Sequence, residues 1–203
     1  MKQAEFKNKL GPLLKRWALS FVLLPFVLLY AIHMYKALSY NIFMAVDNNY
    51  PAFFSFVFFI LKSLTTLFHE GGHGIFGIFG SRFVTIAGGS FMQLLIPALC
   101  LGYGYLNDKR WIIQLSWFYL GYNFIDVAAY AADAGARALP LIGGLGKSAH
   151  DWHNLLVMTG GLQYDAFIGY LFFWTGCACF ALALLLPAWR RDYRYADLDL
   201  NLS

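Results

Sequence analysis

The fold is decided by residues 51–79, which read PAFFSFVFFILKSLTTLFHEGGHGIFGIF. The stretch is rich in aromatic and aliphatic side chains, and it is longer than the roughly 20 mostly apolar residues that a membrane helix needs. Its second half places three ionisable side chains, His69, Glu70 and His73, within one short run. Because ionisable groups inside a membrane segment are costly, they indicate a functional site. The stretch therefore predicts a membrane helix that carries chemistry.

The composition of the whole chain also indicates a membrane protein. Of its 203 residues, 60% are hydrophobic and only 13% are charged, whereas an average soluble domain carries about 25% charged residues. Most of the surface must therefore face an apolar solvent, and membrane lipid is an expected partner. The net charge of +4 does not indicate nucleic-acid binding, because the basic residues cluster beside apolar segments at the two chain ends.

Apolar stretches of sufficient length predict an all-α fold, a polytopic membrane helix bundle of about five transmembrane helices. We expect these helices over residues 17–35, 51–79, 86–106, 111–133 and 166–189. Residues 1–189 then form a single membrane-embedded domain, followed by a polar tail over residues 190–203. We expect an integral, multi-pass protein of a bacterial inner membrane with its basic N-terminus in the cytoplasm. The sequence does not indicate an oligomeric state.

The spacing of the two histidines predicts a metal site. Residues four apart share one face of a helix, so His69 and His73 can bind one Zn²⁺ ion through their imidazoles. Glu70 follows the first histidine and can act as general base toward water. Only two glutamates occur in the chain, and Glu70 is the one inside an apolar segment.

Zinc needs a third protein ligand and an open position for water. With five spans, the end of the second helix, the end of the fourth helix and the loop 134–165 meet at one membrane face. This places the predicted site between the second and fourth helices. The candidate ligands there are Asp126, Asp133, His150, Asp151 and His153.

Three stretches resemble elements of the site-2 protease family of intramembrane zinc proteases, in its short form without a PDZ domain. Residues 69–74, HEGGHG, resemble the HExGH helix of that family. Residues 88–93, GGSFMQ, are similar to its G-P-x-x-N stretch, with Ser90 in place of proline and Gln93 in place of asparagine. Residues 133–137, DAGAR, are similar to its Asp-Gly-Gly-Arg element.

The resemblance implies an intramembrane zinc endopeptidase that hydrolyses a peptide bond in a transmembrane protein or peptide substrate, by zinc-activated water. It implies His69, His73 and Asp133 as zinc ligands and Glu70 as the general base. Gln93 could hydrogen-bond the substrate strand or polarise the scissile carbonyl, or it could only bridge two helices. The alternative function is a catalytically inactive, protease-like membrane protein that binds clients or metal ions.

Two further polar groups have open interpretations. For Asp126, we favour an ion pair with Lys62 over zinc ligation, since pairing would hide both charges from lipid. His150, Asp151 and His153 could orient a ligand or cap the site from the loop. A solvated loop without a role in the site is the other interpretation of these residues.

Overall fold

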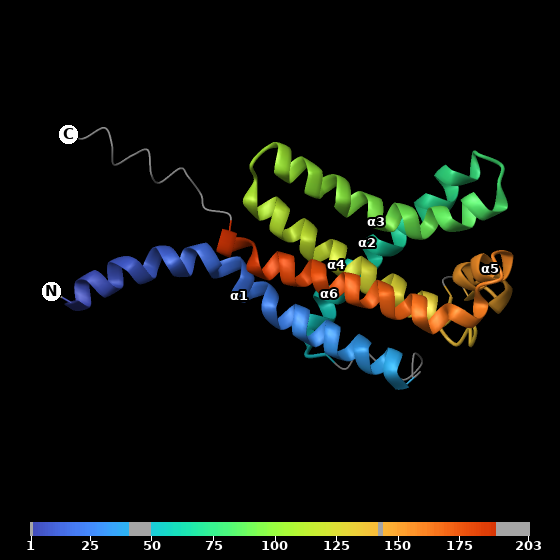
Figure 1. Ribbon diagram of the computed structural model, residues 1–203, viewed down its shortest axis with the longest axis horizontal. Helices are drawn as coiled ribbons and strands as arrows, with labels where there is room; N and C mark the ends of the chain where they lie inside the picture. Colours follow the sequence, from blue (N-terminus) through green and yellow to red (C-terminus); the bar gives the residue numbers. More distant parts are fainter. Residues whose placement is uncertain (1, 41–49, 142–143, 190–203) are drawn as a thin grey trace.

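A computed structural model of the chain describes residues 2–40, 50–141 and 144–189, which fold into helices joined by turns and short loops (Figure 1). No strand occurs in these ranges. The all-α fold that the sequence predicts is therefore confirmed. Residues 190–203, where we expect a polar tail, lie outside the described part.

Within the described residues, five long helices and one short helix build the bundle. The long ones are α1 (Lys2–Tyr40), α2 (Ala52–Gly77), α3 (Arg82–Leu106), α4 (Arg110–Ala132) and α6 (Asp165–Trp189). The short helix α5 (Asp151–Met158) lies between the 3-10 turns η2 (Lys147–Ala149) and η3 (Leu162–Tyr164). Helix α5 lies at one end of the bundle, close to the beginning of α6 and to the turn that joins α2 to α3 (Figure 1).

Four segments are long and apolar enough to cross a membrane, which fits an integral, multi-pass membrane protein. They are Leu13–Tyr40, Ala52–Gly77, Arg82–Leu106 and Leu162–Trp189. The fifth expected span corresponds to α4, which is long enough but less apolar. Its polar side chains point into the bundle: Asn123 is fully buried, and Gln114 donates hydrogen bonds to Ser20 Oγ at 2.8 Å and to the Ala183 carbonyl at 2.9 Å. Helix α4 is thus shielded by its neighbours.

The centre of the bundle is the contact between α4 and α6, with α3 and α1 also packed against α4. Small residues let α4 and α6 approach closely, as is common between membrane helices. A Cβ atom on Gly176 would lie only 2.8 Å from the Gly121 carbonyl oxygen. Helix α2 packs along α3, and its Thr65 also donates a hydrogen bond to Asn123 Oδ1 of α4 at 2.9 Å.

Candidate metal centre

Three side chains from two helices converge at the α5 end of the bundle. His69 and His73 lie one turn apart on α2, and Asp151 is the first residue of α5. Asp151 Oδ2 lies 2.9 Å from His69 Nε2 and 3.2 Å from His73 Nε2, and the two Nε2 atoms are 3.1 Å apart. Among the described residues, these three are the group of His, Cys, Asp or Glu side chains that could hold a metal ion.

The spacing of these atoms fits zinc. Bonds of 2.0–2.2 Å in a tetrahedral site place neighbouring ligand atoms about 3.3 Å apart. The three observed distances, 2.9, 3.1 and 3.2 Å, are within a few tenths of an ångström of this value. Two imidazoles and one carboxylate are also a donor set that zinc accepts, and they leave the fourth position open for water.

The other ring nitrogens are held by hydrogen-bond acceptors. His69 Nδ1 lies 3.1 Å from Gln93 Oε1, and His73 Nδ1 lies 2.9 Å from the Thr85 carbonyl oxygen. Both Nδ1 atoms therefore carry the ring proton, which leaves the lone pairs of both Nε2 atoms facing Asp151. Three acceptors that face one another in this way need a metal cation or a proton between them.

Helix α3 comes close to both imidazoles because Gly89 has no side chain. A Cβ atom at Gly89 would lie 2.6 Å from His73 Nε2 and 2.9 Å from His69 Cε1. Gly89, the second glycine of the GGSFMQ stretch, thus leaves room for the imidazole rings of His69 and His73. Ser90, next to it, accepts a hydrogen bond from the Trp152 indole at 3.1 Å, which attaches α5 to α3.

No known family matches this chain, nor does any curated protein or solved structure.

Asp151 is held in place by the residues around the start of α5. His150 caps the helix, its Nδ1 accepting a hydrogen bond from the His153 backbone at 3.2 Å. The Tyr130 hydroxyl accepts one from the Asp151 backbone at 3.0 Å. Burial opposes ionisation of Asp151, but hydrogen bonds from His69 and His73, which reach it through Nε2 when a ring carries a second proton, outweigh burial and lower the pKa of Asp151 to about 2. The carboxylate is therefore ionised at neutral pH.

Asp133, the expected third ligand, is not part of this cluster. Its Oδ1 accepts a hydrogen bond from the Ala138 backbone at 2.8 Å and its Oδ2 one from the Leu139 backbone at 2.9 Å. His150 Nε2 lies 3.3 Å from the same Oδ2, and both side chains are almost completely buried. Asp133 thus closes the turn after α4, and the cluster lies between α2 and α5 rather than between the second and fourth spans.

The loop 134–165 contains more structure than the sequence indicates. Asp151 was only one of several candidate ligands, and a solvated loop was an equally open interpretation. The run His150–Asp151 does carry a helix-start signal, because an acidic residue in the first turn favours a helix N-terminus. The contacts of Tyr130 with Asp151 and of Thr85 with His73 have no signal in the sequence.

The predicted pair of Lys62 and Asp126 is confirmed. Lys62 Nζ lies 2.5 Å from Asp126 Oδ1, and Gln93 Nε2 donates to Asp126 Oδ2 at 3.0 Å. Gln93 is only 2% exposed. Its amide joins α2 to α4 through hydrogen bonds, which matches its interpretation as a helix-bridging residue.

Glu70 lies beside the cluster with its side chain exposed. Its carboxylate is close enough to act electrostatically on His73 and on Tyr130. The Glu70 carboxylate is not covered by the rest of the described protein, so it is open to a substrate at the edge of the cluster. This position suits a general base.

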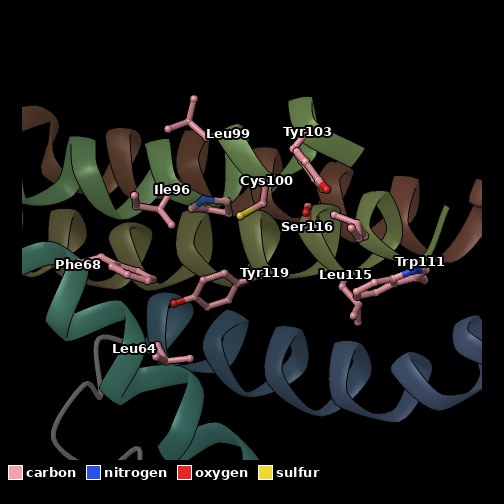
Figure 2. A pocket seen from close by; sticks show the side chains of 12 residues that line it. Leu64, Phe68, Ile96, Leu99, Cys100, Tyr103, Trp111, Leu115, Ser116 and Tyr119 are labelled. Atoms are coloured by element: carbon pink, nitrogen blue, oxygen red, sulfur yellow. The ribbon is translucent and has the colours of Figure 1, made fainter. Parts of the chain in front are cut away.

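An apolar pocket of about 620 Å³ lies between α2, α3 and α4 (Figure 2). Phe68, which precedes His69, reaches it from α2, and Tyr119 reaches it from α4. The Tyr119 hydroxyl is 3.1 Å from Thr65 Oγ1. The residues described as lining the pocket include no histidine or carboxylate.

Proposed function

We propose that this protein is an intramembrane zinc endopeptidase of the site-2 protease type. The observation that carries the proposal is the convergence of three acceptor atoms, His69 Nε2, His73 Nε2 and Asp151 Oδ2, at about the spacing of zinc ligands. When bound, zinc would supply a Lewis acid that polarises a carbonyl and lowers the pKa of water. The ligands would be His69, His73 and Asp151.

Glu70 has the position and chemistry of the general base. Its carboxylate borders the cluster and is exposed. In the proposed reaction Glu70 takes a proton from the attacking water and transfers it to the departing amine, so that the peptide bond is replaced by a carboxylate and an amine. Gln93 is buried and occupied by protein partners, so we assign it no contact with the substrate.

The substrate we propose is a transmembrane protein or peptide. The cluster lies in the last two turns of an apolar helix that is long enough to cross a membrane. Most of the surface near it is apolar, including the pocket beside Phe68. A partner that reaches this site from the lipid would itself be apolar. A bacterial inner membrane, with the N-terminus on the cytoplasmic side, remains our proposed location.

A metal measurement tests the first part of the proposal. We expect the detergent-purified protein to contain about one zinc per chain by mass spectrometry, and His73→Ala and Asp151→Ala each to lose it. Asp133→Asn is the matched control, because Asp133 is a nearby aspartate outside the cluster, and we expect it to keep the metal. Loss of zinc in Asp133→Asn with retention in Asp151→Ala would contradict the assigned ligand set.

A second measurement separates a protease from an inactive protein that binds clients or metal ions. Fluorogenic single-span peptides are reconstituted in liposomes with the wild type or with Glu70→Gln. We expect cleavage only with the wild type, while both proteins contain equal zinc, because the substitution removes the base and no ligand. Zinc binding without cleavage of any peptide in the set would favour the inactive binding protein.

A further inference from the structure

A chain of four side chains connects the middle of α2 to the metal cluster. It begins at Lys62, whose Nζ lies 2.5 Å from Asp126 Oδ1. The other oxygen of Asp126 accepts a hydrogen bond from Gln93 Nε2 at 3.0 Å, and Gln93 Oε1 lies 3.1 Å from His69 Nδ1. Each link crosses from one helix to another, so α2, α4 and α3 all take part.

The carboxylate of Asp126 fixes which way the Gln93 amide points. An ionised carboxylate only accepts hydrogen bonds, so the amide must present its NH₂ group to Asp126 and its oxygen to His69. The Asn123 carbonyl, 3.5 Å from Gln93 Nε2, favours the same orientation. An amide oxygen facing His69 Nδ1 requires the ring proton to be on Nδ1. The lone pair of His69 is then on Nε2, facing His73 and Asp151.

Lys62 orients the Asp126 carboxylate through their ion pair. Its ammonium group is a donor only, and it occupies Oδ1, so Oδ2 is the oxygen left for Gln93. A carboxylate in a membrane bundle is stable as an anion when a cation lies beside it. The Lys62–Asp126 ion pair thus also determines which group of the Gln93 side-chain amide, its NH₂ or its oxygen, faces Asp126.

We propose that the Lys62–Asp126 pair is a positioning device that selects the tautomer of His69 through Gln93. In this assignment Lys62, Asp126 and Gln93 do not touch the reacting groups. They hold the His69 proton on Nδ1 so that Nε2 is free to bind a cation. Only the description of Nε2 as a zinc ligand rests on the proposed function; the preference that Gln93 imposes on Nδ1 can be measured without metal once the competing Asp151 carboxylate is removed.

The substitution Asp126→Asn tests this assignment with almost no change in shape. Next to Lys62, the introduced amide must turn its oxygen toward the ammonium group and its NH₂ toward Gln93. Two NH₂ groups would then face each other, so the Gln93 amide turns over and presents its own NH₂ to His69. We expect the His69 proton to move from Nδ1 to Nε2, the nitrogen that faces the cluster.

The double substitution Lys62→Met with Asp126→Asn supplies the rescue. Without the ammonium group, the introduced amide is free to turn its oxygen toward Gln93, and the original orientation returns. We expect the His69 proton to return to Nδ1. A general packing defect at position 126 would not be repaired by a second substitution on a different helix, so rescue separates positioning from structural damage.

The readout is ¹⁵N NMR of the histidine rings in metal-free protein at alkaline pH, where the imidazoles are neutral. Each protein compared by NMR also carries Asp151→Ala, so that no carboxylate competes for a proton on Nε2; zinc affinities are measured with Asp151 intact. His73 serves as the internal reference, because its Nδ1 is held by the Thr85 carbonyl and should stay protonated in every variant. In parallel, we expect the zinc affinity of Asp126→Asn to fall by about 10–100-fold, the usual effect of disturbing a partner of a metal-binding histidine, and to recover in the double variant.

The outcomes separate this inference from the proposed function. In the Asp151→Ala background, a His69 proton on Nε2 while Asp126 is unchanged, or an unchanged tautomer after Asp126→Asn, overturns the positioning role whether or not zinc binds. A tautomer that switches and is rescued establishes it, even if the wild type binds no zinc. In that last case the protease proposal fails and the positioning role stands.

Discussion

At the scale of single residues, two aspartates near one end of the bundle have different partners. Asp151 faces two imidazole nitrogens, whereas Asp133 accepts hydrogen bonds from the backbone groups of Ala138 and Leu139. Burial of Asp133 opposes its ionisation, but the hydrogen bonds from His150 and the two backbone groups outweigh this effect and lower its pKa. Asp133 therefore contributes to stability as an anion.

We expect Asp133→Asn to lower the melting temperature in detergent without changing the zinc content. The amide nitrogen cannot accept a hydrogen bond, so one of the two backbone donors is left unsatisfied, at a cost of about 1–3 kcal/mol. The pKa of Asp133 is lowered on folding, so its contribution is complete above the unfolded value of about 3.9 and is lost as the pH falls through the folded value.

Thermal melts of both proteins from neutral pH to acid check this prediction. The difference in melting temperature should be largest at neutral pH and should shrink as the solution becomes more acidic than pH 4. A difference that does not depend on pH would show that the charge of Asp133 has no part in stability.

The sequence is sufficient to find His69, Glu70 and His73, because local spacing on one helix determines which side chains are neighbours. It also predicts the partner of Lys62, since two opposite charges in apolar helices must meet. It is not sufficient to choose between Asp133 and Asp151. That choice depends on how the loop 134–165 folds back over α2, and this is set by long-range contacts such as the one between Asp151 and Tyr130.

At the scale of helices, apolar length predicts four of the five long described elements well, whereas α1 (Lys2–Tyr40) begins 15 residues before and ends five residues after its expected range of 17–35. The observed α2, α3, α4 and α6 begin and end within about four residues of their expected limits, the usual uncertainty of helix ends. Helix α5 is missed because its eight residues, DWHNLLVM, are too few to show a helical period. The polar residues that make α4 less apolar than the other spans are those that line the bundle interior.

The contact between α2 and α3 depends on glycine at one position of the motif. A Cβ atom on Gly72 would lie 2.8 Å from both the Gly88 carbonyl carbon and Met92 Cβ, whereas nothing lies within 4 Å of one on Gly71. We expect Gly72→Ala to force the two helices apart and to lower the melting temperature of the metal-free protein. Gly71→Ala, the matched control, should raise it or leave it unchanged, because alanine favours a helix by about 1 kcal/mol over glycine.

Equal melting temperatures for these two variants would contradict the close approach of α2 and α3 at Gly72. Zinc content gives a second check, because α3 supplies Thr85 and Gln93, the acceptors that hold the two histidines. If the helices separate, the zinc affinity of Gly72→Ala should fall together with its stability.

At the scale of the whole molecule, the cluster lies toward one face of the membrane. Helix α2 has 26 residues, so it is about 39 Å long, compared with a hydrocarbon thickness of about 30 Å. His69 precedes the end of this helix, Gly77, by about 12 Å of helix rise. If α2 is centred in the bilayer, His69 lies about 7–8 Å from the midplane, roughly halfway to the edge of the hydrocarbon region. Helix α5, which lies at that end of the bundle (Figure 1), supplies Asp151 to the cluster.

A metal ion at this place would join α2 to α5, two elements far apart in the sequence, and should therefore stabilise the whole molecule. A ligand that binds only the folded state adds about 2.7 kcal/mol at a concentration one hundred times its Kd. We expect zinc to raise the melting temperature of the metal-stripped protein, and hydrogen exchange in the loop 134–165 to slow, because Asp151 fixes that loop to α2. Neither effect should occur in His73→Ala. An equal rise in that variant would mean that zinc binds elsewhere, and a rise without slower exchange would mean that Asp151 is not a ligand.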